Sequence, residues 1–179
     1  ICKKTGQASE FDIRYFTPIT EIPACRHATL GSARIAMMLD NVNAATFHTI
    51  EGIRLKTISK QDDILMQYPR YEWKKSNAEA ATLKSLGISK YNAIAFSAEL
   101  ETLFIELESS NELQKIQPDY PQLIKSSSHI KEVVITSVSD DPQYDYLLRS
   151  FCPWIGIDED PVTGSVHSVL GSYWQQRLN

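Results

Sequence analysis

The sequence predicts an α+β fold in which a sheet curls around a central helix. Strand-like segments dominate the first half of the 179-residue chain, and the segment 28–40, ATLGSARIAMMLD, is a helix that is apolar on nearly every side. We expect a helix of that kind to be buried all round, which requires a sheet that wraps it. An internal repeat, described below, predicts that this arrangement occurs twice.

Composition sets limits on both fold and function. A chain of this length with 42% hydrophobic and 22% charged residues can bury a substantial core. The net charge is −4 and the basic residues are scattered, so neither nucleic acid nor an anionic membrane is an expected partner. Three cysteines without CxxC spacing, and no signal peptide or long apolar run, predict a cytoplasmic protein. Because the sequence starts at ICKKTGQ without Met and stops at WQQRLN within a helical pattern, we expect a fragment.

The first half is predicted to be rich in short strands. The segment 11–18 alternates polar and apolar residues and ends at Pro18, and the central helix follows it. Three further strands are predicted over 44–50, 52–58 and 63–69.

The second half mixes both element types. Residues 76–87 have a helix frame, with Ser76 as N-cap and Gly87 as C-cap. Strands are predicted over 93–98, 102–109, 132–139 and 144–153, and helices over 118–127 and 163–178.

The repeat is an Arg-x-Phe-x-Pro motif, which closes a strand at residues 14–18 and again at 149–153. Both copies lead through a short acidic loop into a helix, and the same offset places Cys25 opposite Asp160. This pattern predicts a duplicated fold with similar halves over 1–75 and 76–179.

Two helix N-termini facing one cleft would form a site for a small anionic metabolite. The first N–H groups of a helix have no internal partner and carry partial positive charge, which favours a carboxylate or phosphate. Gly164 would let backbone approach the ligand, while Thr163 or Ser165 would cap the helix or donate to the ligand. The same helix end would stabilise the acidic cluster 158–160 beside it.

Two long segments resemble the signatures of the PhzF-like phenazine-biosynthesis family. Residues 144–174, which contain EDPVTGS, resemble the second signature, and residues 12–33, DIRYFTPITEIPACRHATLGSA, resemble the first. The resemblance implies a diaminopimelate-epimerase-like fold of two similar domains, in a homodimer. It also implies a cofactor-independent isomerase, related to one that moves a proton across the cyclohexadiene carboxylate of dihydro-hydroxyanthranilate.

The resemblance also implies the site. His27 and Asp160 match catalytic positions. Cys25, Arg26, Thr163, Gly164 and Ser165 match substrate-binding positions. The family's general base, a Glu in an Asn-Leu-Ser-Glu-Thr segment upstream of the first signature, is not in this sequence. Arg26 replaces the Gly of the usual Gly-His pair, where it would either clamp a carboxylate or block the site.

Each assignment has a plainer alternative. Asp160 could be a solvated loop acid, and Cys25 either an activated thiolate at a helix N-terminus or a small buried hydrophobe. His167 could contact the site or cap its helix. The remaining acids and histidines, Asp158, Glu159, His48 and His129, are expected to be loop or structural residues. Cys25-Arg26-His27 lacks metal-ligand spacing, so no metal is expected.

Reaction type follows from the pairing of Cys25 with Asp160. A racemase would require two matched acid/base groups, so directional proton transfer is the better hypothesis, and an epimerase would need a second Cys at position 160. The rival from another class is a catalytically silent binding or interaction protein of the same family, with Arg26 as a sign of lost activity.

Overall fold

The computed structural model describes residues 1–178, and it has the predicted α+β architecture. The chain divides into two compact units, Ile1–Pro69 with Val162–Ser165, and Arg70–Pro161 with the residues from Val166 on. The assignment of 1–75 and 76–179 as halves of a duplicated fold stays a prediction.

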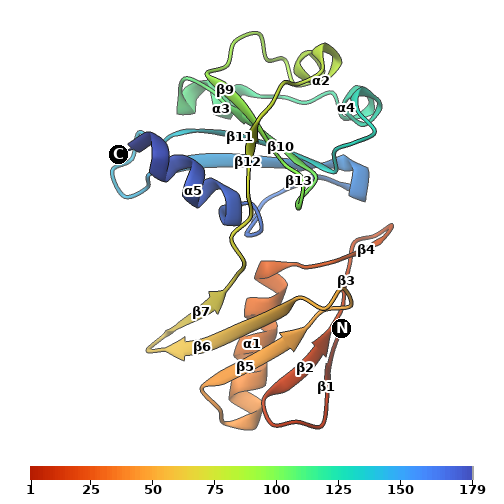
Figure 1. Cartoon of the computed structure of the whole chain (residues 1–179), viewed down its shortest axis with the longest axis vertical. Coiled ribbons are helices and arrows are strands. Elements are labelled where there is room, and N and C mark those ends of the chain that lie inside the picture. The colour runs from red at the N-terminus through yellow and green to blue at the C-terminus, as the bar shows by residue number, and fades with distance from the viewer. Residues whose placement is uncertain (179) are drawn as a thin grey trace. The chain divides into compact units, whose positions relative to one another are not determined.

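The first unit is built on a five-stranded sheet with α1 (Arg26–Asp40) packed on one face, as Figure 1 shows. The pair β2 and β5 is parallel and joined through α1, and every other neighbouring pair in this sheet is antiparallel. The predicted strand 11–18 is divided at Arg14, because the chain leaves the sheet there to form a separate two-stranded ribbon. In spatial order the sheet contains β1 (Cys2–Lys4), β2 (Glu10–Ile13), β5 (Ala44–His48), β6 (Arg54–Lys60) and β7 (Asp63–Gln67), and the ribbon contains β3 (Tyr15–Phe16) and β4 (Glu21–Ile22).

Helix α1 buries one stripe rather than its whole circumference. The side chains that it buries recur at helical spacing: Thr29, Ala33, Ala36 and Met37. Opposite them, Ile35, Met38 and Leu39 are 56%, 69% and 79% exposed. The prediction of a helix buried all round is therefore wrong for the described residues, because the sheet covers a single face of α1.

The second unit is a six-stranded sheet with helices on both faces. The pair β10 and β11 is parallel, and the other neighbouring pairs are antiparallel. In spatial order the strands are β13 (Ile157–Asp160), β12 (Tyr146–Cys152), β11 (Glu132–Val138), β10 (Thr102–Glu106), β9 (Ala93–Ser97) and β8 (Lys74–Lys75).

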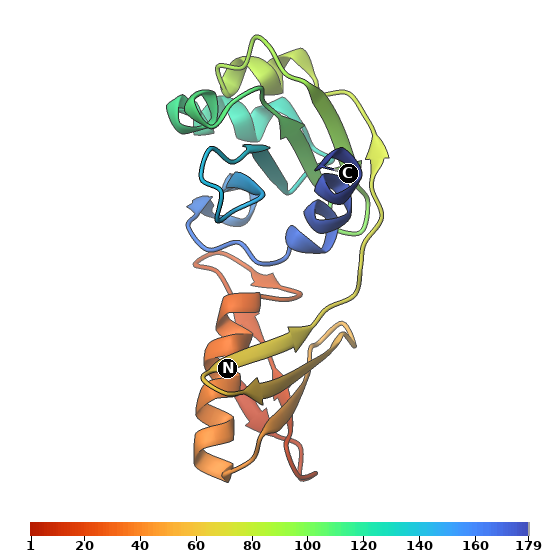
Figure 2. The ribbon, with the colours of Figure 1, turned by 90° about the vertical axis from the view of Figure 1, so that its left-hand side faces the viewer.

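Two apolar layers hold these helices to the sheet. One face packs against α2 (Ala80–Ser85), α3 (Ser110–Lys115) and α4 (Tyr120–Ser126), and the opposite face packs against α5 (His167–Leu178). Figure 2 shows α5 in dark blue on the side of the sheet away from α2. A short 3₁₀ turn, η1 (Pro153–Ile155), follows β12.

Three helices differ from the prediction. Helix α2 begins at Ala80 after Glu79, not after Ser76. Helix α3 was not predicted, although Ser109 caps it by accepting a hydrogen bond from the Glu112 N–H. Helix α5 begins at His167, four residues later than expected, because Val162–Ser165 packs with the first unit instead of continuing the helix.

The arginines of the two copies of the repeated motif make the same two kinds of contact. Arg14 makes a two-point ion pair with Glu21, at 2.8 Å from Nε and 2.6 Å from Nη2, and its guanidinium lies 5.1 Å from the Phe16 ring centroid. In the second copy Arg149 pairs with Glu159 at 2.7 and 2.8 Å and lies 4.9 Å from the ring of the corresponding Phe. Each arginine therefore binds a carboxylate in the part of the chain that follows it.

All three tryptophans belong to the second unit. Trp73 meets the Tyr173 ring edge-on at 5.1 Å, and Trp174 donates its indole N–H to the Thr136 hydroxyl at 3.1 Å. Trp154 donates to two backbone carbonyls near the end of α4. Among residues 1–178, no helix has the length and apolar character needed to cross a membrane.

Candidate active site

The start of α1 is fixed by a chain of hydrogen bonds. Cys25 is its N-cap, and the Thr29 N–H and hydroxyl both donate to the Cys25 carbonyl, at 3.0 and 2.7 Å. The Tyr15 hydroxyl in turn lies 2.5 Å from the Thr29 hydroxyl oxygen. Burial raises the pKa of Tyr15 to about 12, so it remains a neutral donor. The first turn of α1 is therefore held to the ribbon that precedes it.

The segment Val162–Ser165 is bound to this helix start. The His27 Nδ1–H donates to the Val162 carbonyl at 2.9 Å, and Arg26 donates through Nη1 to the Gly164 carbonyl. Four of the predicted site residues, Cys25, Arg26, His27 and Gly164, are thus brought together, with Thr163 and Ser165 half-buried in the same segment.

Arg26 explains why position 164 is a glycine. A Cβ placed there would lie 2.6 Å from the Arg26 Cβ and 2.8 Å from its Cδ, which is closer than real carbon atoms approach. The close approach that the sequence suggested for a ligand is made in this structure by the Arg26 side chain.

The guanidinium of Arg26 also stacks on an aromatic ring. Its central carbon lies 3.5 Å from the Tyr68 ring centroid, the geometry of a cation–π contact. Burial raises the pKa of Tyr68, although the neighbouring positive charge opposes that shift. Tyr68 was not singled out from the sequence, where it lies in the predicted strand 63–69.

Cys25 and His27 form a close thiol–imidazole pair. The sulfur lies 3.2 Å from the His27 Nε2 and 3.7 Å from its Nδ1. Because a backbone carbonyl only accepts, the Val162 contact places the imidazole proton on Nδ1 and makes Nε2 the nitrogen that carries the lone pair.

Asp160 belongs to the second unit, where it ends β13 rather than beginning a helix. It lies opposite Ser150 on the neighbouring strand. The sequence argument that a helix end stabilises the acidic cluster is wrong for Glu159, because that carboxylate is bound by Arg149 and α5 begins only at His167.

Behind Asp160, a row of polar side chains crosses four strands of the sheet. Glu132 accepts hydrogen bonds from the Thr102 hydroxyl at 2.9 Å and from the Ser150 hydroxyl. Strand register places Thr102 opposite Glu132 and Ser150 opposite Asp160, so all four side chains share one face. Sequence analysis missed this row, since a single Glu at the start of an apolar strand looked like an ordinary strand end.

Burial within this row changes the ionisation of Glu132. Glu132 is half-buried as a residue but its carboxyl group is desolvated, which raises its pKa; the two hydroxyl donors oppose this shift, and the charge of Asp160 adds to it. Burial, together with these carboxylates, raises the pKa of the nearby Cys152 thiol to about 12.

The other histidines are held by local partners or exposed. His167 Nδ1 lies 2.6 Å from the Tyr146 hydroxyl, and His48 pairs with Glu10 at 2.9 Å. His129 is exposed. No group of three or more potential metal ligands occurs within residues 1–178.

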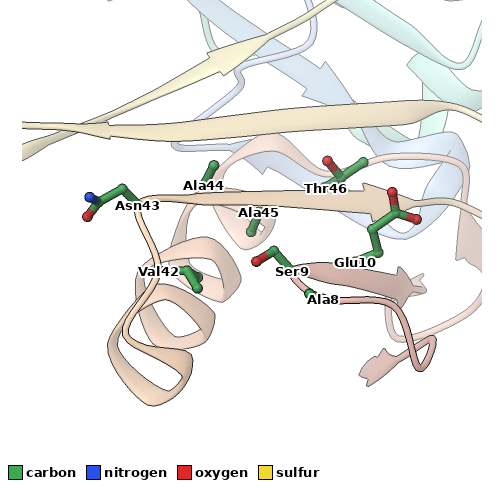
Figure 3. Close-up of a pocket in the computed structure, with 8 residues that line it drawn as sticks. All are labelled: Ala8, Ser9, Glu10, Val42, Asn43, Ala44, Ala45 and Thr46. Carbon is green, nitrogen blue, oxygen red and sulfur yellow. The ribbon is translucent and has the colours of Figure 1, made fainter.

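A separate pocket of about 370 Å³ lies in the first unit, where β2 and β5 begin (Figure 3). Its carboxylate, Glu10, is already paired with His48 and Arg54, and the rest of its lining is small or uncharged. None of the predicted site residues lines it. The lining comprises Ala8, Ser9, Glu10, Val42, Asn43, Ala44, Ala45 and Thr46.

Comparison with known proteins identifies the family of this chain. The family model described as phenazine biosynthesis-like protein (PhzC-PhzF) matches residues 1–179. The chain belongs to the PhzC-PhzF family. It is 36% identical over 174 residues to an uncharacterised isomerase of Halalkalibacterium halodurans, covering 94% of this chain and 63% of that protein. It is 34% identical over 187 residues to the phenazine biosynthesis-like domain-containing protein of Rattus norvegicus, covering 97% and 65%.

A solved PhzF family structure confirms the fold. The chain superimposes on the Enterococcus faecalis protein with a TM-score of 0.83 and 27% identity, over 99% of this chain and 66% of that one. The PhzC-PhzF chain therefore has the diaminopimelate-epimerase-like fold that the resemblance implied. It spans just under two thirds of the length of the curated relatives that it matches.

Proposed function

We propose that this PhzC-PhzF chain is part of a cofactor-independent isomerase that transfers a proton on a small substrate bearing a carboxylate. The name of the Halalkalibacterium relative, an uncharacterised isomerase, supports the reaction class. The observation that carries the proposal is the His27 imidazole, whose tautomer is fixed by the Val162 carbonyl so that Nε2 is the acid/base nitrogen.

The charge at the start of α1 suits an anionic substrate. Helix α1 has 15 residues and no acidic residue in its first turn, so its N-terminal N–H groups and partial positive charge are not neutralised there. Arg26 lies in that same turn and adds a full positive charge. We expect the substrate carboxylate to bind at this end.

Asp160 is proposed as the second acid/base group. It is separated from Val162, the residue held by His27, by Pro161 alone. Ser150 lies opposite it on the neighbouring strand, and the Asp160 charge contributes to the raised pKa of the nearby Glu132 carboxyl. The family resemblance assigns the general base to a Glu in a segment upstream of the first signature.

The test measures solvent deuterium entering the substrate. The protein as its gene encodes it is incubated in D₂O with dihydro-hydroxyanthranilate and other unsaturated cyclic carboxylates, and exchange is followed by proton NMR. We expect Asp160→Asn and His27→Asn each to slow exchange by about 10²- to 10⁴-fold, the usual contribution of a positioned acid or base.

Two matched controls accompany these variants. Asp158→Asn removes a neighbouring exposed carboxylate, and His129→Asn removes an exposed imidazole; both should leave exchange unchanged. If Asp160→Asn exchanged as fast as the wild type, Asp160 would have no part in the chemistry.

One observation favours the alternative, a silent PhzF-like binding protein. Arg26 occupies the usual glycine position and is held by both Gly164 and Tyr68, so it fills space at the start of α1. Arg26→Gly distinguishes the two functions. Faster deuterium exchange in this variant would show that the arginine obstructs an active site. Absence of exchange in both the wild type and the variant would favour the silent binding protein.

A further inference from the structure

The strand that carries Asp160 is paired irregularly with its neighbour. Strand β13 is four residues long and lies at the edge of the six-stranded sheet. It pairs with β12 at Ser150 with Asp160 and at Cys152 with Ile157, and the register shifts between these two pairs. Irregular pairing of this kind bends a strand and redirects its side chains, and it is frequent next to active sites. The backbone ladder alone therefore leaves the end of β13 loosely fixed.

A side-chain contact adds what the ladder lacks. The Nε and Nη2 atoms of Arg149 on β12 donate to the two carboxylate oxygens of Glu159, at 2.7 and 2.8 Å. Two parallel hydrogen bonds fix the orientation of a carboxylate as well as its distance. The side chains are 23% and 35% exposed, so solvent screens this ion pair only in part. Glu159 directly precedes Asp160, and its position therefore limits where Asp160 can lie.

The guanidinium of Arg149 is itself held by groups outside β13. Its Nη1 donates to the carbonyls of Leu113 and Ile116, at 3.2 and 2.7 Å, where helix α3 ends. Its central carbon lies 4.9 Å from the ring centroid of the fully buried Phe151. Arg149 thus connects the end of β13 to α3 and to the apolar core of the second unit.

The Arg149–Glu159 pair and Asp160 use opposite faces of the sheet. Successive side chains of a strand point to opposite faces. Ser150 lies opposite Asp160 on one face, so the residues just before them, Arg149 and Glu159, share the other. The ion pair can therefore fix the position of Asp160 from behind, without contacting a molecule that Asp160 binds.

We propose that Arg149 is a positioning residue for the proton transfer, and that it acts through Glu159 to hold the Asp160 carboxylate in place. The inference rests on the proposed function, in which Asp160 is an acid/base group. Neither Arg149 nor Glu159 contacts the substrate in this role.

The first test measures how fast solvent deuterium enters the substrate at a series of substrate concentrations. Arg149→Lys keeps the positive charge but cannot make the two parallel hydrogen bonds. We expect its maximal rate to fall by about 10- to 10²-fold, the usual cost of a misplaced catalytic group. The half-saturating substrate concentration should change little, because the substrate carboxylate is proposed to bind at the start of α1.

A double-mutant cycle tests whether Arg149 acts through Glu159. Glu159→Gln should also lower the maximal rate, and Arg149→Lys combined with Glu159→Gln should be no slower than the slower single variant, because both changes break one contact. Arg54→Lys is the matched control. It alters an arginine that pairs with Glu10 in the first unit, and it should leave the rate unchanged.

A second measurement needs no substrate. Amide hydrogen exchange, followed by mass spectrometry, should be several times faster over Ile157–Asp160 in Arg149→Lys than in the wild type, because the end of β13 opens more often. Exchange over the central strand β11 should be unchanged. If Arg149→Lys does not fold, Glu159→Gln gives both measurements, since its changed side chain is the more exposed of the two.

The outcomes separate this inference from the proposed function. A folded variant with faster amide exchange in β13 but an unchanged rate of deuterium entry into the substrate would show that the pair is only structural. Unchanged amide exchange in β13 would show that the pair does not hold this strand. Either result overturns the inference alone, whereas a wild type that transfers no deuterium would overturn the proposed function and the inference with it.

Discussion

Glu132 is a single residue whose ionisation is coupled to folding. Burial raises the pKa of its carboxyl above the value of 4.5 expected in the unfolded chain. Between 4.5 and the higher folded value, the folded protein keeps a proton that the unfolded chain releases, so this residue's contribution to stability falls as pH rises through that window. Below 4.5 the contribution is fully present.

We therefore expect Glu132→Gln to remove one pH-dependent component of stability. Urea unfolding followed from pH 4 to 8 should show the wild type losing free energy of unfolding, relative to the variant, as pH rises through the window. Glu108→Gln, which alters an exposed glutamate next to β10, is the control and should show no such trend. A pH-independent difference between wild type and Glu132→Gln would mean that Glu132 ionises normally in the folded protein.

At the same scale, sequence reasoning identified the residues that motifs mark and missed those that only strand pairing assembles. The offset between the two Arg-x-Phe-x-Pro copies directed attention to Cys25 and Asp160. Glu132 carries no such mark, because its partners come from strands 30 positions upstream and 18 positions downstream. Their meeting depends on register, which local sequence does not reveal.

Among the elements, the segment Val162–Ser165 approaches the Arg26 side chain closely at Gly164. We expect Gly164→Ala to displace it, because the new Cβ would collide with the Arg26 side chain near its backbone. Overpacking of this kind costs about 1–3 kcal/mol, measured as a loss in the free energy of unfolding in urea.

Gly171→Ala is the matched control for that substitution. Gly171 is exposed inside α5, nothing lies within 4 Å of the position of its missing Cβ, and alanine there should stabilise the helix by up to about 1 kcal/mol. Similar changes in both variants would argue against tight packing at Gly164.

Element boundaries show where local sequence suffices and where it does not. The strands at 44–48, 63–67 and 93–97 lie inside their predicted ranges, because alternating or continuous apolar residues define them locally. Helix α5 starts late since Arg26 and His27, far away in sequence, bind the carbonyls of the residues before it. The exposed face of α1 was mispredicted because apolar residues on a helix face do not show whether another element packs against that face.

For the whole molecule, the duplicated motif was the strongest signal of fold class. Each copy forms an arginine–glutamate pair with a phenylalanine beneath it, and the family comparison confirms the fold. The departure of Val162–Ser165 into the first unit was not predictable from periodicity, because four residues within a loop carry none.

Each unit has its own apolar core, so we expect the two to lose structure at different urea concentrations. Indole emission comes from the second unit alone, whereas far-ultraviolet circular dichroism senses both. The dichroism curve should therefore contain a transition, the unfolding of the first unit, that the fluorescence of the native tryptophans does not detect. Phe16→Trp would place a fluorophore in the first unit and make that transition visible by fluorescence. Superimposable curves from dichroism, native fluorescence and the fluorescence of the variant would instead mean that the protein unfolds in a single two-state transition.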